Sequence, residues 1–327
     1  MSDSTFPDAL PARKPGRFGN RPTPRAFVFA SDPQYPWTPA SDDDMEQSDS
    51  ERDRQSQELI NEQYASIASY RNSFGGTGIP VMINGDMTAF GHGWQREVLY
   101  PALQHHLKEN YYFGLGNHDY KNNINDTLND GAARDSIMDL INHHQNRVDI
   151  MHLETFRGAD ETRYSGSLSY SMSFGRVRLI QLNNEPTYRV SFNSGLHASR
   201  VRFFISDALD WLEQQLEESH EHGQITLLNL HQPDFWDGTR EDHDRFSSMM
   251  RRYPVHAVFA GHYHKEAGDF YRGVGRYGGA PVYLSGSASQ RTYLIAELSD
   301  DADALTIKCA WNNDWANAEV LATLELQ

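Results

Sequence analysis

Residues 25–38, RAFVFASDPQYPWT, join an apolar run directly to a carboxylate and an amide. The run from Phe27 to Ala30 is apolar throughout, which predicts a buried strand. Asp32 and Gln34 follow the end of this strand and are two residues apart, so both side chains can point at the same spot. This spacing is compatible with a turn, a helix cap or half of a metal site, and the stretch alone leaves all three open.

Four further stretches share this arrangement, in which an apolar strand ends in side chains that can bind a metal. Glycine precedes three of the five motifs, where the backbone has to turn sharply or let a ligand approach closely. In open α/β sheets, sites form beyond the carboxyl ends of the strands. Five such ends therefore converge on one crevice if the strands are neighbours. The four stretches are Gly85-Asp86, Gly116-Asn117-His118-Asp119, Leu230-His231 and Gly261-His262-Tyr263-His264.

The candidate ligands are oxygen and imidazole donors without a thiolate, a set that suits Mn, Fe or Zn but not a structural zinc site built on cysteine. Seven candidates exceed what one ion needs, and a carboxylate between two ions can bridge them. Asp86, in the middle of the set, is the natural bridge. Two ions roughly 3.5–4 Å apart can clamp a phosphoryl group and generate hydroxide at neutral pH. The candidates are Asp32, Gln34, Asp86, Asn117, His231, His262 and His264.

Each motif by itself has a plainer explanation. Asp32 can cap a turn with Pro33, His231 can be a packed core histidine, and the pair His262 and His264 can belong to a packed loop. The occurrence of all five motifs in order, each at the end of a strand, favours the metal site over these alternatives.

The periodicity along the chain predicts an α/β fold, with two stacked mixed β-sheets flanked by helices in a single domain. Residues 1–24 are expected to form a flexible N-terminal lead. The domain is expected to occupy residues 25–327, with a polar insertion near 120–165 over the site. Helices are predicted over 55–70, 94–108, 203–218 and 242–252, and strands over 26–31, 79–85, 168–184 (as a pair), near 281–285, 291–298, 304–311 and 319–326.

The formal charge of −16 argues against a general grip on nucleic acid, which needs a basic surface. The acidic run from Asp42 to Glu51 is interpreted as a solvated loop that leads into a helix N-terminus. The single cysteine, Cys309, rules out an internal disulfide and fits a reducing compartment. No apolar run is long enough to cross a bilayer and the N-terminus lacks the apolar core of a secretory signal. A cytoplasmic location is therefore expected, although export by a route without such a signal stays open.

The ordered set DPQ, NGD, GNHD, LH and GHYH resembles the calcineurin-like metallophosphoesterase superfamily over residues 26 to about 290. The resemblance implies a two-sheet sandwich with helices outside, and a phosphoesterase that hydrolyses a phosphate mono- or diester by in-line attack of metal-bound hydroxide. It also implies that His118 protonates the leaving oxygen and that Asp119 hydrogen-bonds His118 and orients it. One metal would be held by Asp32, Gln34, Asp86 and His264, and the other by Asp86, Asn117, His231 and His262.

Gln34 departs from the family pattern, because most relatives have His at this position. An amide oxygen is a weaker ligand than imidazole, so the first metal is expected to bind less tightly. The Asp-Pro-Gln form resembles a branch that includes protein serine/threonine phosphatases. The contrasting hypothesis is a non-catalytic metal-binding scaffold for partner proteins.

The substrate side of the site is less defined by the sequence. A small phosphoester or a phosphoprotein is expected as substrate, and the oligomeric state is not predicted. Tyr35, Pro36 and Trp37 either wall the substrate pocket or pack in the core. The remaining candidates for shaping the pocket or contacting phosphate are Glu185, Ser285, Ser287, Arg189 and Arg200. The histidines without strand-end context are interpreted as surface or insertion residues, namely His105, His106, His143, His144 and His152.

Overall fold

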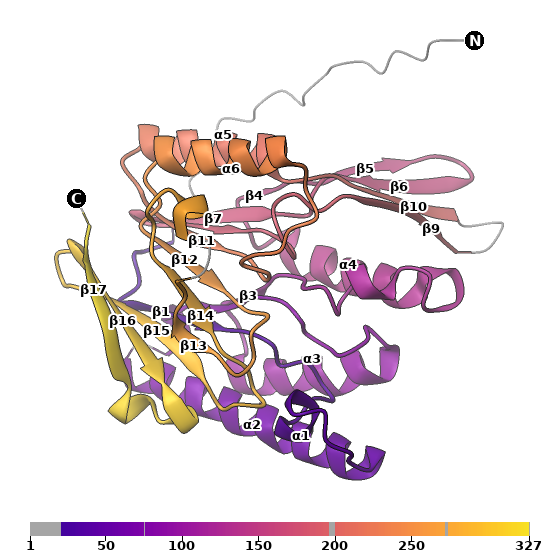
Figure 1. Cartoon of the computed structure of the whole chain (residues 1–327), viewed down its shortest axis with the longest axis horizontal. Coiled ribbons are helices and arrows are strands. Elements are labelled where there is room, and N and C mark those ends of the chain that lie inside the picture. Colours follow the sequence, from indigo (N-terminus) through magenta and orange to yellow (C-terminus); the bar gives the residue numbers. More distant parts are fainter. Residues whose placement is uncertain (1–20, 75, 196–199, 272–273, 327) are drawn as a thin grey trace.

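Two mixed β-sheets lie face to face, with helices on both outer sides (Figure 1). The computed structural model describes residues 21–74, 76–195, 200–271 and 274–326. The arrangement confirms the predicted fold class, an α/β sandwich of two stacked sheets in a single domain. Most of the expected N-terminal lead lies outside the described residues.

The first sheet has six strands in the order β17-β16-β15-β1-β2-β3. Strands β1, β2 and β3 are parallel to one another, whereas β15 runs antiparallel to β1 and continues into an antiparallel ladder at the C-terminal edge. All residues of β1 to β3 are buried, as the apolar runs predict. The strands are β1 (Ala26–Ala30), β2 (Val81–Ile83), β3 (Tyr111–Phe113), β15 (Tyr293–Leu298), β16 (Ala304–Ala310) and β17 (Glu319–Glu325).

The second sheet has seven strands in the order β13-β14-β12-β11-β8-β7-β4. Its centre, β14-β12-β11-β8, is parallel, and antiparallel strands flank it on both sides. The parallel strands of both sheets therefore supply the carboxyl ends at which the sequence motifs stand. The strands are β4 (Ile150–Met151), β7 (Tyr170–Phe174), β8 (Val177–Gln181), β11 (Ile225–Asn229), β12 (Ala257–Ala260), β13 (Ala267–Asp269) and β14 (Val282–Ser285).

The helices cover the outer faces of the two sheets. Helices α2 and α3 lie along the six-stranded sheet, and α5 and α6 lie along the seven-stranded sheet (Figure 1). In α2 the buried Ile60, Tyr64 and Ile67 recur at a spacing of three to four residues, so one face of the helix packs against the sheet. The helices are α1 (Pro39–Asp42), α2 (Asp49–Phe74), α3 (Gly93–Leu107), α4 (Gly131–His144), α5 (Leu209–Glu221) and α6 (Arg240–Arg252).

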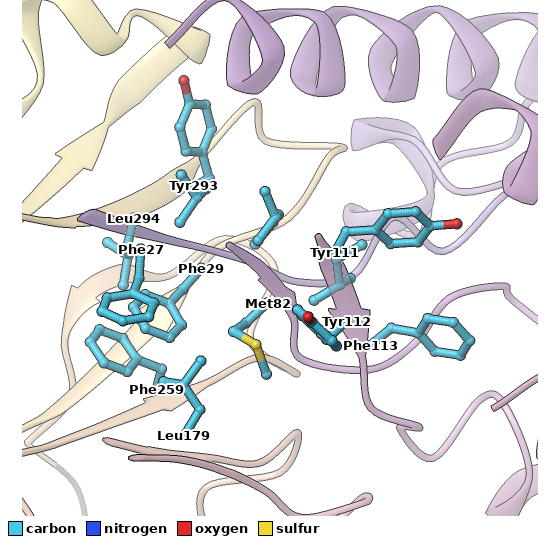
Figure 2. Close-up of a cluster of buried hydrophobic side chains, with 14 of the residues drawn as sticks. Phe27, Phe29, Met82, Tyr111, Tyr112, Phe113, Leu179, Phe259, Tyr293 and Leu294 are labelled. Carbon is cyan, nitrogen blue, oxygen red and sulfur yellow. The ribbon is translucent and has the colours of Figure 1, made fainter. Parts of the chain in front are cut away.

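Large apolar side chains fill the space between the two sheets (Figure 2). Phe29 of β1 stacks on Phe259 of β12, with ring centroids 3.6 Å apart and an interplanar angle of 5°. Both rings are fully buried, and burial of an aromatic side chain of this size stabilises the fold by about 2–3 kcal/mol. This contact joins β1 to β12, and each of these strands is followed by candidate metal ligands.

A third, four-stranded sheet in the order β5-β6-β10-β9 extends to one side of the sandwich (Figure 1). Residues 120–165 contribute α4, β4, β5 and β6, and Ala133, Ile137 and Leu140 of α4 belong to the buried core. The strands of this sheet are β5 (Glu154–Arg157), β6 (Glu161–Ser165), β9 (Val190–Ser194) and β10 (Arg200–Ile205).

One expectation about local structure is wrong. The helix expected to start at Phe203 starts at Leu209, because Phe203 is a buried residue of β10 and stacks on Phe192 and Tyr164 of the neighbouring strands. Of the two alternatives given for His144, a surface residue or a residue of the insertion, the first does not hold, because His144 is fully buried and its Nε2 accepts a hydrogen bond of 3.1 Å from the Phe113 amide. Among the described residues, none of the helices has the length and apolar character that a membrane crossing requires.

Candidate metal centre

The five motifs stand at the carboxyl ends of β1, β2 and β3 in one sheet and of β11 and β12 in the other. The strands are therefore not all neighbours in one sheet; two sets of parallel strands end at the same side of the sandwich. Asp32 follows β1 and Asp86 follows β2, and the Asp32 amide donates 3.1 Å to the Gly85 carbonyl. His231 lies across from them, with Nδ1 2.8 Å from the Asn84 carbonyl oxygen.

Four candidate ligands adopt the left-handed backbone conformation that non-glycine residues usually avoid. The φ angles are +49° at Asp32, +38° at Gln34, +49° at Asp86 and +76° at His262. Each such residue costs on the order of 1–3 kcal/mol, and the surrounding contacts have to enforce it. These four positive φ angles occur where the candidate ligands converge, and such conformations are found at functional sites.

Glycine before the motifs permits close contact between the loops. At Gly116 a Cβ atom would stand 2.2 Å from Asp86 Oδ1, and at Gly261 it would stand 1.8 Å from Ser31 Oγ. The φ of Gly85 is +90°, which a residue with a side chain adopts only with strain. The glycines are thus required because the ligand-bearing loops pack directly on one another.

A first group of potential ligands consists of Asp32, Asp86 and His264, which offer ligand atoms within 4.8 Å of one another. His264 Nε2 lies 3.3 Å from Asp32 Oδ1. Gln34 is fully buried, and neither of its side-chain polar atoms has a hydrogen-bond partner among the described residues. The same holds for Asp32 Oδ1.

A second group consists of Asp86, His231 and His262 and meets the same 4.8 Å limit. His231 Nε2 lies 3.1 Å from Asp86 Oδ2 and 3.0 Å from Asn117 Oδ1. His262 Nδ1 lies 3.1 Å from the same Asn117 oxygen. Asp86 belongs to both groups, which is the position expected of a bridging carboxylate.

The chemistry of these atoms fits bound cations. Buried polar atoms are normally hydrogen-bonded, so the unpartnered Asp32 Oδ1 and Gln34 Oε1 indicate a missing electron-pair acceptor. Oxygen and imidazole donors converge without a thiolate, the combination that suits divalent metals such as Mn, Fe or Zn.

The pKa values of the histidines report the negative charge of this pocket. Burial disfavours the charged form of His264, but the neighbouring carboxylates of Asp32 and Asp42 outweigh burial and raise its pKa to about 10. For His231, burial is likewise outweighed by the charges of Asp86 and Asp32, which raise its pKa to about 9. His262 behaves differently, since burial and the neighbouring His231 lower its pKa to about 4. The carboxylates attract positive charge, which protons or metal ions can supply.

His118 stands beside the shared carboxylate. Its backbone amide donates 2.8 Å to Asp86 Oδ1, and its ring Nδ1 lies 2.8 Å from the carbonyl oxygen of Ala89. A carbonyl oxygen only accepts, so Nδ1 carries a proton and Nε2 is the nitrogen left for other chemistry. No atom of His118 belongs to either potential metal group.

Asp119 contacts backbone atoms and not the His118 ring, so the expected hydrogen bond from Asp119 to His118 is replaced by the one to Ala89. The Asp119 carboxylate accepts from the amides of Met87 (2.9 Å), Thr88 (3.2 Å) and Gly116 (2.9 Å). Burial and the charge of Asp86 raise the pKa of Asp119. Asp119 thus joins the loop after β2 to the loop after β3, and it acts on His118 only through the backbone.

Aromatic side chains line the first motif. The half-buried Trp37 lies edge-on to both His118 and His264, with ring centroids 5.6 Å apart in each case. Tyr35 is buried and packs edge-on against Trp94, with centroids 5.8 Å apart. Trp37 therefore lies at the site, whereas Tyr35 belongs to the core.

The remaining pocket candidates have structural partners. Glu185 accepts hydrogen bonds from the amide and hydroxyl of Thr187. Arg189 forms ion pairs with Asp207 and Asp242, each at 3.0 Å, and Arg200 is an exposed residue of β10. Ser287 lies closer to the metal groups, because its hydroxyl donates 3.2 Å to the backbone carbonyl of His264. Ser285 Oγ accepts 3.4 Å from Asn84 Nδ2.

Asp42 is a site residue that the sequence analysis missed. Asp42 belongs to the acidic run that we interpret as a solvated loop, and Asp43 and Asp44 of this run are exposed. The Asp42 side chain is only 3% exposed, and its Oδ1 lies 2.6 Å from His264 Nδ1. Its sequence neighbours, Thr38 as a helix N-cap and Pro39 at the first helical position, predict a short helix that could have set Asp42 apart from the rest of the run.

The chain matches the model of a known protein family. A model described as calcineurin-like phosphoesterase matches residues 27–266, most of the chain and every candidate ligand. No curated protein matches the chain in sequence.

Solved structures give distant matches. The protein TT1561 of Thermus thermophilus is 9% identical, with 84% of this chain and 95% of that chain covered and a TM-score of 0.42. A structure of PhoD is 11% identical, with 91% and 68% covered and a TM-score of 0.49. A protein serine/threonine phosphatase from Saccharomyces cerevisiae with similarity to human phosphatase PP5 is 12% identical, with 93% and 81% covered and a TM-score of 0.36. The family match, and not these structures, carries the assignment.

Proposed function

We propose that this chain, which belongs to the calcineurin-like phosphoesterase family, is a two-metal hydrolase of phosphate mono- or diesters with His118 as the general acid. The observation that carries the proposal is the sharing of Asp86 between two potential metal groups, with His118 attached to the same carboxylate by its backbone amide. With His118 as the acid, this arrangement would put a proton donor next to the place where two cations would lie.

The residues divide into two sets by the metal they would hold. When bound, the ions would supply Lewis-acid stabilisation of the phosphoryl oxygens and an activated water for in-line attack. Asp86 would serve both ions. The first would be held by Asp32, Gln34, Asp86 and His264, and the second by Asp86, Asn117, His231 and His262.

His118 would handle the proton of the leaving group. Its Nδ1–H donates to the Ala89 carbonyl, which fixes the orientation of the ring and leaves Nε2 for the proton transfer. The proton on Nε2 would then pass to the oxygen that departs from phosphorus. Asp119 would keep the loop of Asp86 and the loop of His118 in register through its backbone contacts.

The substrate would be a small phosphoester or a phosphoprotein. The chain has a formal charge of −16, and three of its basic side chains are paired with carboxylates: Arg189 with Asp242, Lys121 with Asp237 and Lys265 with Asp43. Such a surface disfavours long polyanions and leaves recognition of the phosphoryl group to the metal centre.

The test is hydrolysis of p-nitrophenyl phosphate and bis-p-nitrophenyl phosphate by the full chain, with and without added Mn²⁺, together with elemental analysis of the purified protein. We expect metal-stimulated turnover of at least one substrate and up to two equivalents of metal. A folded protein that binds no metal and hydrolyses neither substrate would contradict the proposal. The ratio of the two rates would separate a monoesterase from a diesterase.

A further inference from the structure

Asp42 is held in a complete set of hydrogen bonds. Its Oδ1 accepts from His264 Nδ1 at 2.6 Å and from the Trp37 indole N–H at 2.7 Å. Its Oδ2 accepts from Ser289 Oγ at 2.6 Å and from Gln290 Nε2 at 2.7 Å. The carboxylate thus joins α1, the loop after β12 and the loop after β14, three segments far apart in the sequence. A buried carboxylate with four donors has little freedom to move.

The contact with His264 determines which ring nitrogen faces the first group. Because the Asp42 carboxylate accepts from Nδ1, Nε2 is the ring nitrogen that faces Asp32 Oδ1, 3.3 Å away, and the one available to a metal. A carboxylate behind a metal-binding histidine also makes the imidazole a stronger electron-pair donor.

The second group is built differently. His231 Nδ1 is held by the backbone carbonyl of Asn84 at 2.8 Å, so its ring is oriented by a neutral partner, and Asp32 Oδ1 lies beyond hydrogen-bond distance at 4.0 Å. Under the function proposed above, Gln34 would be a further ligand of the first metal, and its neutral amide would bind more weakly than an imidazole. The charged partner of His264, Asp42, therefore supports the metal that would have the weaker set of ligands.

Asp42 also fixes Trp37. The indole N–H donates to the same Oδ1 that contacts His264, and the Trp37 ring lies edge-on to both His264 and His118. Loss of the carboxylate would release two side chains at the site, one of them beside the candidate acid.

From this geometry, and resting on the function proposed above, we infer that Asp42 is a positioning residue for the first metal group, which orients His264 and offsets the weak donor Gln34. Asp42 does not touch the reacting atoms. Its effect is therefore selective for one of the two metal groups.

The experiment compares Asp42→Asn and Asp42→Ala with Asp43→Asn as the matched control. Asp43 is the next residue of the same acidic run and carries the same charge, but it is exposed and pairs with the exposed Lys265. For each protein the two Mn²⁺ dissociation constants are measured by competition with a chelator, and turnover of p-nitrophenyl phosphate or its diester is measured against Mn²⁺ concentration.

We expect Asp42→Asn to weaken one of the two Mn²⁺ sites by roughly 10–100-fold and Asp42→Ala to weaken it at least as much, in line with losses at other partners of metal-binding histidines. The other site should be unchanged, and excess Mn²⁺ should restore most of kcat. Asp43→Asn should stay within about twofold of the wild type.

Two results would overturn the inference while leaving the proposed function intact. In one, both Asp42 variants bind two Mn²⁺ ions with wild-type affinity. In the other, both sites weaken equally together with a lower melting temperature and excess Mn²⁺ restores nothing, which would make Asp42 a purely structural residue. A wild-type protein without metal binding or turnover would instead overturn the proposed function and the inference together.

Discussion

Two groups of buried or half-buried histidines in this chain have opposite electrostatic surroundings. His231 and His264 at the metal centre have carboxylates within 3.3 Å, and their pKa values are raised to about 9 and 10. His143 and His144 at the end of α4 have backbone and aromatic neighbours, and burial lowers their pKa values, to about 4 for His143. Burial opposes charge at all four residues. The neighbouring carboxylates decide whether a buried imidazole attracts a cation or stays neutral.

The largest effect is expected from removing the carboxylate that the two metal groups share. In Asp86→Ala, His231 loses its closest charged neighbour and becomes a neutral buried imidazole like His144. We expect loss of both metals, and a fall in kcat/KM on the order of 10³-fold, because metal ions contribute several kcal/mol of transition-state stabilisation.

Elemental analysis and steady-state kinetics measure these two quantities for the Asp86→Ala protein. Circular dichroism serves as the control for folding. Retention of two metal equivalents by the folded variant would remove Asp86 from the bridging position.

The second largest effect is expected from replacing His118, which belongs to neither of the two histidine groups compared above. His118→Asn removes the proton donor but none of the potential ligands, so the metal content should stay the same while kcat falls by about 10²–10⁴-fold. The loss should be larger for an alkyl phosphate than for p-nitrophenyl phosphate, because the nitrophenolate departs without needing a proton.

The comparison of the two substrates is the decisive measurement for His118→Asn. An equal loss for both would mean that His118 acts on something other than the leaving oxygen. A loss of metal would mean that His118 supports the ligands.

His143 and His144 of α4 predict how the free energy of unfolding depends on pH. The folded-state pKa of His143 lies below the ordinary value of 6.5, so the unfolded chain takes up a proton first as the pH falls. The contribution of the neutral ring is complete above about pH 6.5 and is lost progressively toward pH 4. Between pH 7 and pH 5 this residue should cost about 1–2 kcal/mol of the free energy of unfolding.

The variant His143→Gln does not titrate, and its amide N–H can still donate to the Tyr111 carbonyl that His143 Nε2 contacts at 3.0 Å. Urea unfolding with chelator present, at pH 7 and pH 5, should show a smaller loss for His143→Gln than for the wild type. His105→Gln, at an exposed position of α3, is the control and should leave the loss unchanged. An identical pH dependence in all three proteins would refute the prediction.

The smallest effect is expected where an imidazole is added to the site. Gln34→His places a stronger donor next to Asp32, and we expect the first metal to bind on the order of tenfold more tightly. The first Mn²⁺ dissociation constant, measured by chelator competition, tests this. If that constant and the activity both stay the same, Gln34 is not a ligand.

Much of the site is local in sequence and was accessible without the structure. An apolar strand followed by Asp, Asn or His is a pattern within a few residues, and its repetition in five places indicated converging strand ends. The alternation of strands and helices is also local, because hydrophobic periodicity depends on residues that are neighbours in the chain. It therefore indicated the sandwich. The helix boundary near residue 203 was wrong because Phe203 pairs with strands more distant along the chain.

The sequence by itself therefore determined which candidate side chains follow the ends of strands and in which order they occur along the chain. Only the tertiary structure decided that Asp42 hydrogen-bonds His264 although the acids next to it are exposed, that Asp119 binds backbone amides, and that His144 is buried. The physical reason is that these roles depend on contacts across the fold. Asp42 and His264 are 222 residues apart, and no periodicity in the sequence encodes a hydrogen bond over that separation.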